Sequence, residues 1–267
     1  MCDIFGMSFQ NGSTFINSTR ASYIIRELFN ENKIYSPKTA GVVFTTPKEI
    51  AVMGSTLPAD DFIRSKEFTD ASRNYMNVLR KDGIVSVLGY CGDAHSENNK
   101  HPTVINGIVG VCDGVVYNEK DLSNKLGKNN GEKTGNSIIF ELIDYFRNKH
   151  LMLMPEAMIH AASLVSGKYS CVFVEKSNPF LLWIIRSQGS LVARQYADCG
   201  LILFATRSCS VNNVIDSMYL GLNKDSCNFI TIPENHSACI NLFSNKISIY
   251  RNIEASKELA CNGCSYI

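Results

Sequence analysis

Apolar and polar residues along the chain follow two patterns, one typical of strands and the other of helices. Short apolar runs rich in β-branched residues predict strands in two groups, one early in the chain and one near its end. The predicted strands are residues 2–9, 39–46, 48–55, 83–91, 103–114, 168–175, 180–187, 191–196, 201–207, 228–234, 237–244 and 246–251.

Apolar residues that recur every three or four positions predict helices. In segment 136–149 the residues on one helical face are Ile138, Ile139, Leu142, Ile143 and Phe146. The predicted helices are residues 19–33, 59–83, 118–127, 136–149, 154–167 and 210–221. Two groups of strands with helices clustered between them favour an α+β domain with four layers: helix, sheet, sheet and helix.

Charge and hydropathy exclude several classes of function. Among 267 residues, 26 Lys and Arg balance 25 Asp and Glu, so we predict no nucleic-acid partner. The longest apolar candidate, residues 179–193, falls short of the roughly 20 residues of a membrane helix and contains Arg186, so we predict no membrane association. The N-terminus shows no secretory signal, which makes a cytoplasmic location the expectation.

The chain has ten cysteines scattered mostly through apolar runs. Without a secretory signal, we expect most of them to be reduced and buried. Cys261 and Cys264 form a lone CxxC without a second ligand pair, and His95 and His101 lie in a turn-rich loop where solvated side chains are expected. The prediction is therefore no metal and no cofactor.

Several motifs, taken together and in order, resemble one family. The start MCDIFGMSF resembles the MCGIFG start of class II glutamine amidotransferases, which are N-terminal-nucleophile (Ntn) hydrolases. TAG at 39–41 is similar to the family's RGPDSAG segment. VLGYCGDAHSENNKHP (87–102) resembles LGHTRxxTxGxxxxxNxHP, and GVCDGVVYNEKDL (110–122) resembles xxHNGEIYNyxeL.

Later segments are similar to the same family. LLWIIRSQGSLVARQY resembles ARDxxGxxPLyY, GLILFATRS resembles LxFASE, and ITIPENHSACINL resembles the LPPGxxxxI turn. The resemblance implies a single αββα Ntn-hydrolase domain over residues 1–255, followed by a C-terminal tail at 256–267.

The resemblance also implies a reaction. Once Met1 is removed, Cys2 attacks the side-chain amide of glutamine and its own α-amine serves as the base, which gives glutamate and ammonia. In the family an Asn–Gly pair forms the oxyanion hole. Its counterpart here is Asp113–Gly114, in which Gly114 keeps the backbone N–H.

This chain departs from the family at the positions that hold glutamine. The arginine of HTR, which holds the α-carboxylate, falls on Gly92, and the arginine of RG falls on Tyr35. The aspartate that holds the α-amine falls on Gly135. Losing one buried bidentate arginine contact costs about 2–5 kcal/mol in binding.

The residue at the oxyanion position also differs from the family motif. An ionised Asp113 cannot donate a hydrogen bond, and its charge opposes the developing oxyanion. Cys112 replaces the neighbouring histidine, and Asp3 replaces the glycine after the nucleophile, which puts a further carboxylate beside the site. A protonated Asp113 could still donate a hydrogen bond. Arginines outside the motifs could supply the missing cation: Arg73, Arg80 and Arg207.

The expected function is therefore a class II glutamine amidotransferase-like protein whose ancestral glutaminase reaction is impaired or repurposed. Two alternatives stay open: a catalytically inactive subunit with a binding or structural role, and a hydrolase for a different amide. Whether the protein is an enzyme is not decided by the residues. A separate synthase or assembly partner is expected, and the oligomeric state is unknown.

Overall fold

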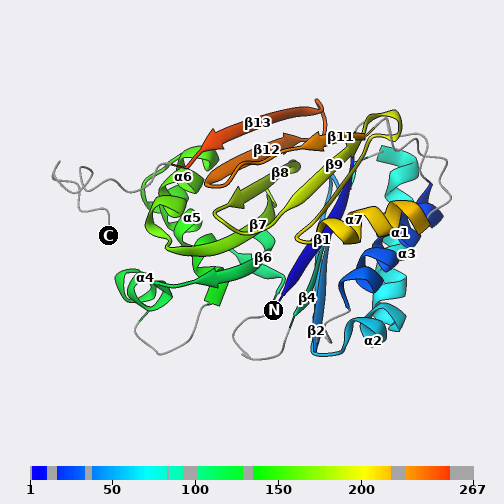
Figure 1. Ribbon diagram of the computed structural model, residues 1–267, viewed down its shortest axis with the longest axis horizontal. Coiled ribbons are helices and arrows are strands. Elements are labelled where there is room, and N and C mark those ends of the chain that lie inside the picture. The colour runs from blue at the N-terminus through cyan, green and yellow to red at the C-terminus, as the bar shows by residue number, and fades with distance from the viewer. Residues whose placement is uncertain are drawn as a thin grey trace.

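The computed structural model describes residues 2–10, 17–33, 38–82, 84–92, 101–128, 135–217 and 227–252. Within these ranges, two antiparallel sheets pack face to face (Figure 1). Sheet A contains, in spatial order, β11 (Cys227–Ile230), β9 (Val192–Tyr196), β10 (Leu201–Ala205), β1 (Asp3–Phe9), β4 (Val85–Gly92), β2 (Thr39–Thr45) and β3 (Ile50–Ser55). Sheet B contains β13 (Lys246–Arg251), β12 (His236–Asn241), β8 (Asn178–Arg186), β7 (Gly167–Glu175), β6 (Ile108–Val116) and β5 (Thr103–Ile105).

Helices cover the outer face of each sheet (Figure 1). The helices on sheet A are α1 (Ser18–Asn32), α2 (Ala59–Arg64), α3 (Lys66–Asp82) and α7 (Ser208–Ser217). On sheet B they are α5 (Ile138–Lys149) and α6 (Met154–Leu164), with α4 (Glu119–Lys125) against α5. Two short 3₁₀ turns are present in the described residues, η1 (Gly135–Ser137) and η2 (Ala197–Cys199). The predicted α+β class with four layers is confirmed.

The alternation of side chains along β1 shows how the layers form. Successive residues of a strand point to opposite faces of its sheet. Ile4 packs between the two sheets, whereas Phe5, Met7 and Phe9 pack under the helices of sheet A. All seven residues of β1 are buried, because the strand lies inside its sheet with a layer on each face.

Two predicted elements are each divided in two. The predicted strand 103–114 is a hairpin, β5 and β6, which turns at Asn106–Gly107 with φ of 43° and 96°. Positive φ at both turn residues favours Asn-Gly, so the turn signal was present in the sequence. The predicted helix 59–83 breaks at Ser65, whose Oγ accepts a hydrogen bond from the N–H of Phe68 at 3.1 Å and so caps α3.

A disulfide joins the neighbouring strands β6 and β7, contrary to the expectation that the cysteines there are reduced. Cys112 and Cys171 lie directly opposite each other in the ladder, and their sulfur atoms are bonded. Both side chains are fully buried against α5 and α6. Six other described cysteines form no disulfide: Cys2, Cys91, Cys199, Cys209, Cys227 and Cys239. Of these, Cys91, Cys199 and Cys239 are buried, as expected.

No helix in the described ranges is long and apolar enough to cross a membrane. The CxxC at 261–264, the tail 256–267 and the end of the predicted domain at 255 lie outside the described residues.

The disulfide generates a stability prediction. Replacing both cysteines, in Cys112→Ala/Cys171→Ala, should lower the free energy of unfolding by about 2–4 kcal/mol, because the crosslink restricts the unfolded chain. Guanidinium unfolding with and without a thiol reductant measures this effect. The wild-type midpoint should fall in reductant, whereas the midpoint of the double variant should not move. A wild-type midpoint that ignores reductant would contradict the crosslink.

Candidate functional site

Cys2 lies at the end of sheet A, just before the first residue of β1. Asp3 pairs with Cys91 of β4, so Cys2 stands next to Gly92. By strand alternation Cys2 faces the space between the sheets, and its side chain packs against the core there. The sulfur of Cys2 lies 3.2 Å from the hydroxyl oxygen of Tyr90.

Tyr90 is the neighbour that sequence reasoning missed. Its side chain is 1% exposed and its ring packs against the ring of His101, with centroids 4.7 Å apart. Burial, followed by the charge of the neighbouring Cys2, raises the pKa of Tyr90 well above its ordinary value. The phenol is therefore a protonated group that can donate to the sulfur of Cys2.

The space beside Gly92, where a larger residue would place its side chain, is already occupied. A Cβ atom at Gly92 would lie 2.0 Å from the hydroxyl oxygen of Tyr90 and 3.0 Å from the sulfur of Cys2. The Tyr90 hydroxyl thus fills the space where a side chain at position 92 would begin. Position 92 adjoins the sulfur, but glycine there offers no side chain to bind a carboxylate.

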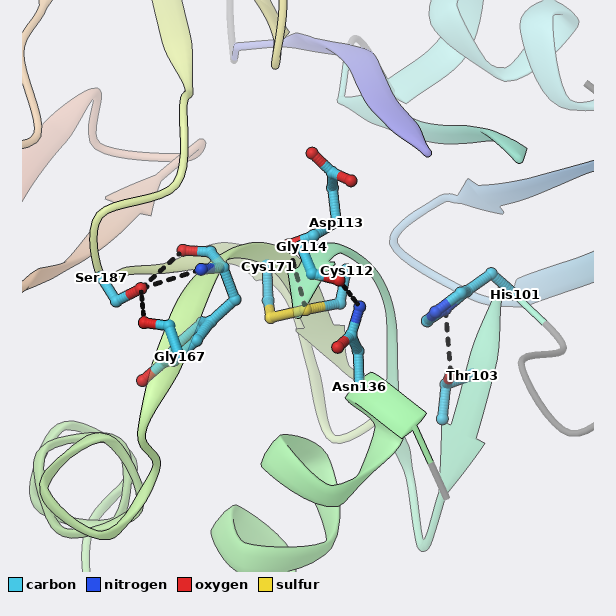
Figure 2. The surroundings of a disulfide bond; sticks show 10 residues. His101, Thr103, Cys112, Asp113, Gly114, Asn136, Gly167, Cys171 and Ser187 are labelled. Atoms are coloured by element: carbon cyan, nitrogen blue, oxygen red, sulfur yellow. Dashed lines mark hydrogen bonds between the residues drawn. A yellow bond between two sulfur atoms is a disulfide. The ribbon is translucent and has the colours of Figure 1, made fainter. Parts of the chain in front are cut away.

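Asp113 and Gly114 lie at the same end of sheet B, on β6, which packs against β1 and β4. Gly114 has a φ of 119°, and a Cβ there would lie 2.0 Å from the carbonyl oxygen of Lys168. Glycine is therefore required at this position. Figure 2 shows the Asp113 side chain pointing away from the Cys112–Cys171 disulfide, toward the end of sheet A.

Electrostatics tie Asp113 to the nucleophile end of sheet A. Burial, followed by the negative charge of Asp3, raises the pKa of Asp113 to about 7. A hydrogen bond from the backbone N–H of Gly114 and the charge of the N-terminus oppose this rise. The Asp113 carboxylate in turn contributes to the raised pKa of Tyr90. Tyr90 therefore responds both to the Cys2 thiol, 3.2 Å away, and to the charge of Asp113.

The turn η1 holds the strand that carries Asp113 and Gly114. The side-chain amide of Asn136 donates to the carbonyl oxygen of Gly114 at 2.8 Å, as Figure 2 shows. The backbone N–H of Gly135 donates to the carboxylate of Glu119 at 2.7 Å. Asn136 thus contacts Gly114 directly, a contact that the sequence did not reveal, and Gly135 precedes it in the chain.

Asp3 lies beside the space between the sheets and not in it. It points to the outer face, where its Oδ2 lies 3.3 Å from Nε of Arg207 and its Oδ1 accepts a hydrogen bond from Thr206 at 3.2 Å. Arg207 also donates to the carbonyl oxygen of Glu31. Burial raises the pKa of Asp3, and the charge of Arg207 opposes that rise.

The sequence also pointed to the arginines considered as replacement cations, Arg73, Arg80 and Arg207, and to Tyr35. Arg207 pairs with Asp3 on the outer face of sheet A, and Arg73 lies exposed on α3, 4.0 Å from Asp70. The side chain of Arg80 and all of Tyr35 lie outside the described part of the chain.

His101 is buried rather than solvated. It is 7% exposed, bonds Thr103 at 3.1 Å, and burial lowers its pKa to about 4. His95 lies outside the described residues. Among the described residues, no group of three or more His, Cys, Asp or Glu side chains is placed to hold a metal ion.

Comparisons with known proteins support the fold and a distant relationship to one family. No protein-family model matches the chain. The glutamine–fructose-6-phosphate aminotransferase (isomerizing) of Wigglesworthia glossinidia brevipalpis is 31% identical over 123 residues, which is 40% of this chain and 20% of that enzyme. The enzyme of the same name from Buchnera aphidicola subsp. Baizongia pistaciae is 27% identical over 132 residues, 45% of this chain and 21% of that enzyme. The matched region thus spans about a fifth of each relative.

Solved structures share the fold over nearly the whole chain. Glutamine phosphoribosylpyrophosphate amidotransferase from B. subtilis, in complex with ADP and GMP, superposes with a TM-score of 0.65 at 14% identity. The match covers 94% of this chain and 49% of that one. A structure described as the allosteric regulatory enzyme of purine biosynthesis matches with a TM-score of 0.64, also at 14% identity. The chain is therefore a distant homologue of the class II glutamine amidotransferases, with the two-sheet fold of their N-terminal-nucleophile domain.

Proposed function

We propose that the protein is an amidohydrolase that releases ammonia from a primary amide, with Cys2 as its N-terminal nucleophile. The observation that carries this proposal is the position of Tyr90, whose hydroxyl lies 3.2 Å from the sulfur of Cys2 and whose pKa responds to the charge of Asp113. A nucleophile and a pair of candidate oxyanion contacts on two separate strands make up the minimum set for acyl transfer.

The proposed reaction has two stages. First, the thiol proton of Cys2 moves to the α-amine, the sulfur–carbon bond forms, and the carbonyl oxygen becomes anionic beside Gly114. Collapse breaks the carbon–nitrogen bond, and the ammonium returns its proton so that ammonia leaves. Water then cleaves the thioester, which releases the acid and restores the thiol. The Tyr90 hydroxyl, 3.2 Å from the sulfur, donates to the thiolate as it forms.

Glutamine should bind more weakly to this protein than to a protein that carries the family's arginine and aspartate. Gly92 and Gly135 replace an arginine and an aspartate, and the Tyr90 hydroxyl fills the space beside position 92. Glutamine should therefore be a poor substrate, and an amide without an α-carboxylate a better one. The ammonia produced is proposed to serve a separate synthase.

The alternative of an inactive binding subunit has one observation in its favour. The oxyanion position carries Asp113, and an ionised carboxylate has no hydrogen to donate to an anionic oxygen. Its negative charge would also oppose the charge that develops on that oxygen.

The nucleophile is tested by Cys2→Ala. This variant should lower ammonia release from primary amides by at least about 10³-fold, because the covalent step is lost. Cys209→Ala, which removes an exposed thiol elsewhere, is the matched control and should keep full activity. Intact-mass spectrometry should show that Met1 has been removed. Retained Met1, or unchanged ammonia release by Cys2→Ala, would contradict the proposal.

The filled pocket is tested by restoring the arginine of the motif. Gly92→Arg alone should destabilise the fold by about 1–3 kcal/mol, because its Cβ overlaps Tyr90. Combining it with Tyr90→His, which restores the motif's histidine, should relieve the overlap and lower the KM for glutamine at least about tenfold. Tyr90→His alone is the control and should not improve KM. A Gly92→Arg variant as stable as the wild type would show that Tyr90 does not fill this space.

A further inference from the structure

The imidazole of His101 takes no part in the reaction steps proposed above, although it packs beside the neighbour of the nucleophile. His101 is 7% exposed, and its ring centroid lies 4.7 Å from that of Tyr90, with the ring planes at 45°. Its Nδ1 lies 3.1 Å from the hydroxyl oxygen of Thr103 on β5, the contact drawn in Figure 2. The imidazole is therefore joined to sheet B by a hydrogen bond while it packs on the tyrosine of sheet A that contacts Cys2.

Gly41 makes room for this arrangement. Gly41 of β2 lies directly opposite Tyr90 of β4 in the ladder, and residues paired in this way point to the same face of a sheet. A Cβ atom at position 41 would lie 2.5 Å from the carbonyl oxygen of His101 and 2.5 Å from Cδ of Pro102. The backbone of His101 and Pro102 therefore lies against β2, in the space that a side chain beside Tyr90 would fill.

Backbone pairing alone does not fix the Tyr90 hydroxyl. The ladder places the Cα atom of Tyr90 opposite Ile4, but the position of the hydroxyl also depends on the side-chain torsions. Hydrogen bonds weaken steeply when their geometry is disturbed, so a small rotation of the ring would weaken the 3.2 Å contact with the sulfur of Cys2. The imidazole of His101 lies against this ring and opposes such a rotation.

We propose that His101 is a positioning residue for the nucleophile: it packs on the ring of Tyr90 and so keeps the phenol hydroxyl at hydrogen-bond distance from the sulfur of Cys2. The importance of this contact for turnover rests on the proposed amidohydrolase function. A phenol O–H that donates to the sulfur stabilises the thiolate and leaves the thiol's own proton to move to the α-amine.

Neither Tyr90 nor His101 transfers a proton in this arrangement. Burial raises the pKa of Tyr90, so the phenol keeps its hydrogen at neutral pH. Burial lowers the pKa of His101 to about 4, so its imidazole is neutral there. His101 therefore acts through packing and one hydrogen bond, and its effect on Cys2 passes through the Tyr90 ring.

The contact is tested without amide turnover by the pH profile of Cys2 alkylation with iodoacetamide. Rates are measured between about pH 6 and pH 10. They are measured on the N-terminal peptide by mass spectrometry, because Cys209 is exposed and reacts too. Tyr90→Phe should raise the midpoint of the profile by about one pH unit, since the thiolate loses a hydrogen-bond donor. Tyr196→Phe, at another buried tyrosine of sheet A, is the matched control and should follow the wild type.

The role of His101 is tested by His101→Ala, which should raise the midpoint in the same direction as Tyr90→Phe. The α-amine, Asp3, Arg207 and Asp113, which are the charged groups acting at this end of the sheets, are unchanged in this variant. Circular dichroism first establishes that the variant is folded. Thr103→Val, which removes only the hydrogen-bond partner of the imidazole, is the second variant and should shift the midpoint in the same direction.

A double variant decides whether His101 acts through Tyr90. Tyr90→Phe/His101→Ala should have the same midpoint as Tyr90→Phe alone, because the hydroxyl that His101 positions is already absent. Additive shifts, or midpoints of folded His101→Ala and Thr103→Val equal to that of the wild type, would overturn the proposal. Shifts that follow the prediction while no primary amide is hydrolysed would support the positioning of Tyr90 and count against the proposed function.

Discussion

Hydrogen bonding of β1 along both of its edges fixes the position of the reactive sulfur. The strand pairs with β10 on one side and β4 on the other, from Phe5 to Phe9 and from Asp3 to Phe9 respectively. A slip of one residue would turn every side chain of a strand to the other face. Because Phe5 and its alternate neighbours are buried under helices, such a slip is excluded, and Cys2 must face the space between the sheets.

The ion pair of Asp3 and Arg207 reinforces this register at the point where the strand begins. Asp3 replaces the glycine of the family's start, and Arg207 stands where the similar LxFASE motif has glutamate, so the two departures compensate each other in charge. The pair lies under α1, where Arg207 also contacts the carbonyl oxygen of Glu31. Its remaining effect on the site is electrostatic, since Asp3 makes ionisation of Asp113 harder. Asp3 and Arg207, which lie at opposite ends of the sequence, thus form one ion pair at the start of β1.

The sequence predicted the layers and the motif positions well, because both depend on local patterns. It could not predict which residues meet across strands. The bond between Cys112 and Cys171 depends on the register of β6 against β7, and the Asp3–Arg207 pair joins residues from opposite ends of the chain. The filling of the space beside Gly92 by the Tyr90 hydroxyl is likewise a matter of packing. The Asn106–Gly107 turn is hard to recognise because apolar residues flank it on both sides and resemble one continuous strand.

The central claim is that Cys2 and the Asp113–Gly114 pair form one reaction centre. Its most direct test is a crystal structure, grown below pH 7, of the mature protein with a substrate-like aldehyde in place of the amide. An aldehyde forms a tetrahedral adduct with a cysteine and so resembles the transition state. We predict an adduct on Cys2 whose oxygen lies within hydrogen-bond distance of both the Asp113 carboxyl and the Gly114 N–H. An adduct oxygen directed away from that pair, or modification of Cys209 while Cys2 stays free, would contradict the account.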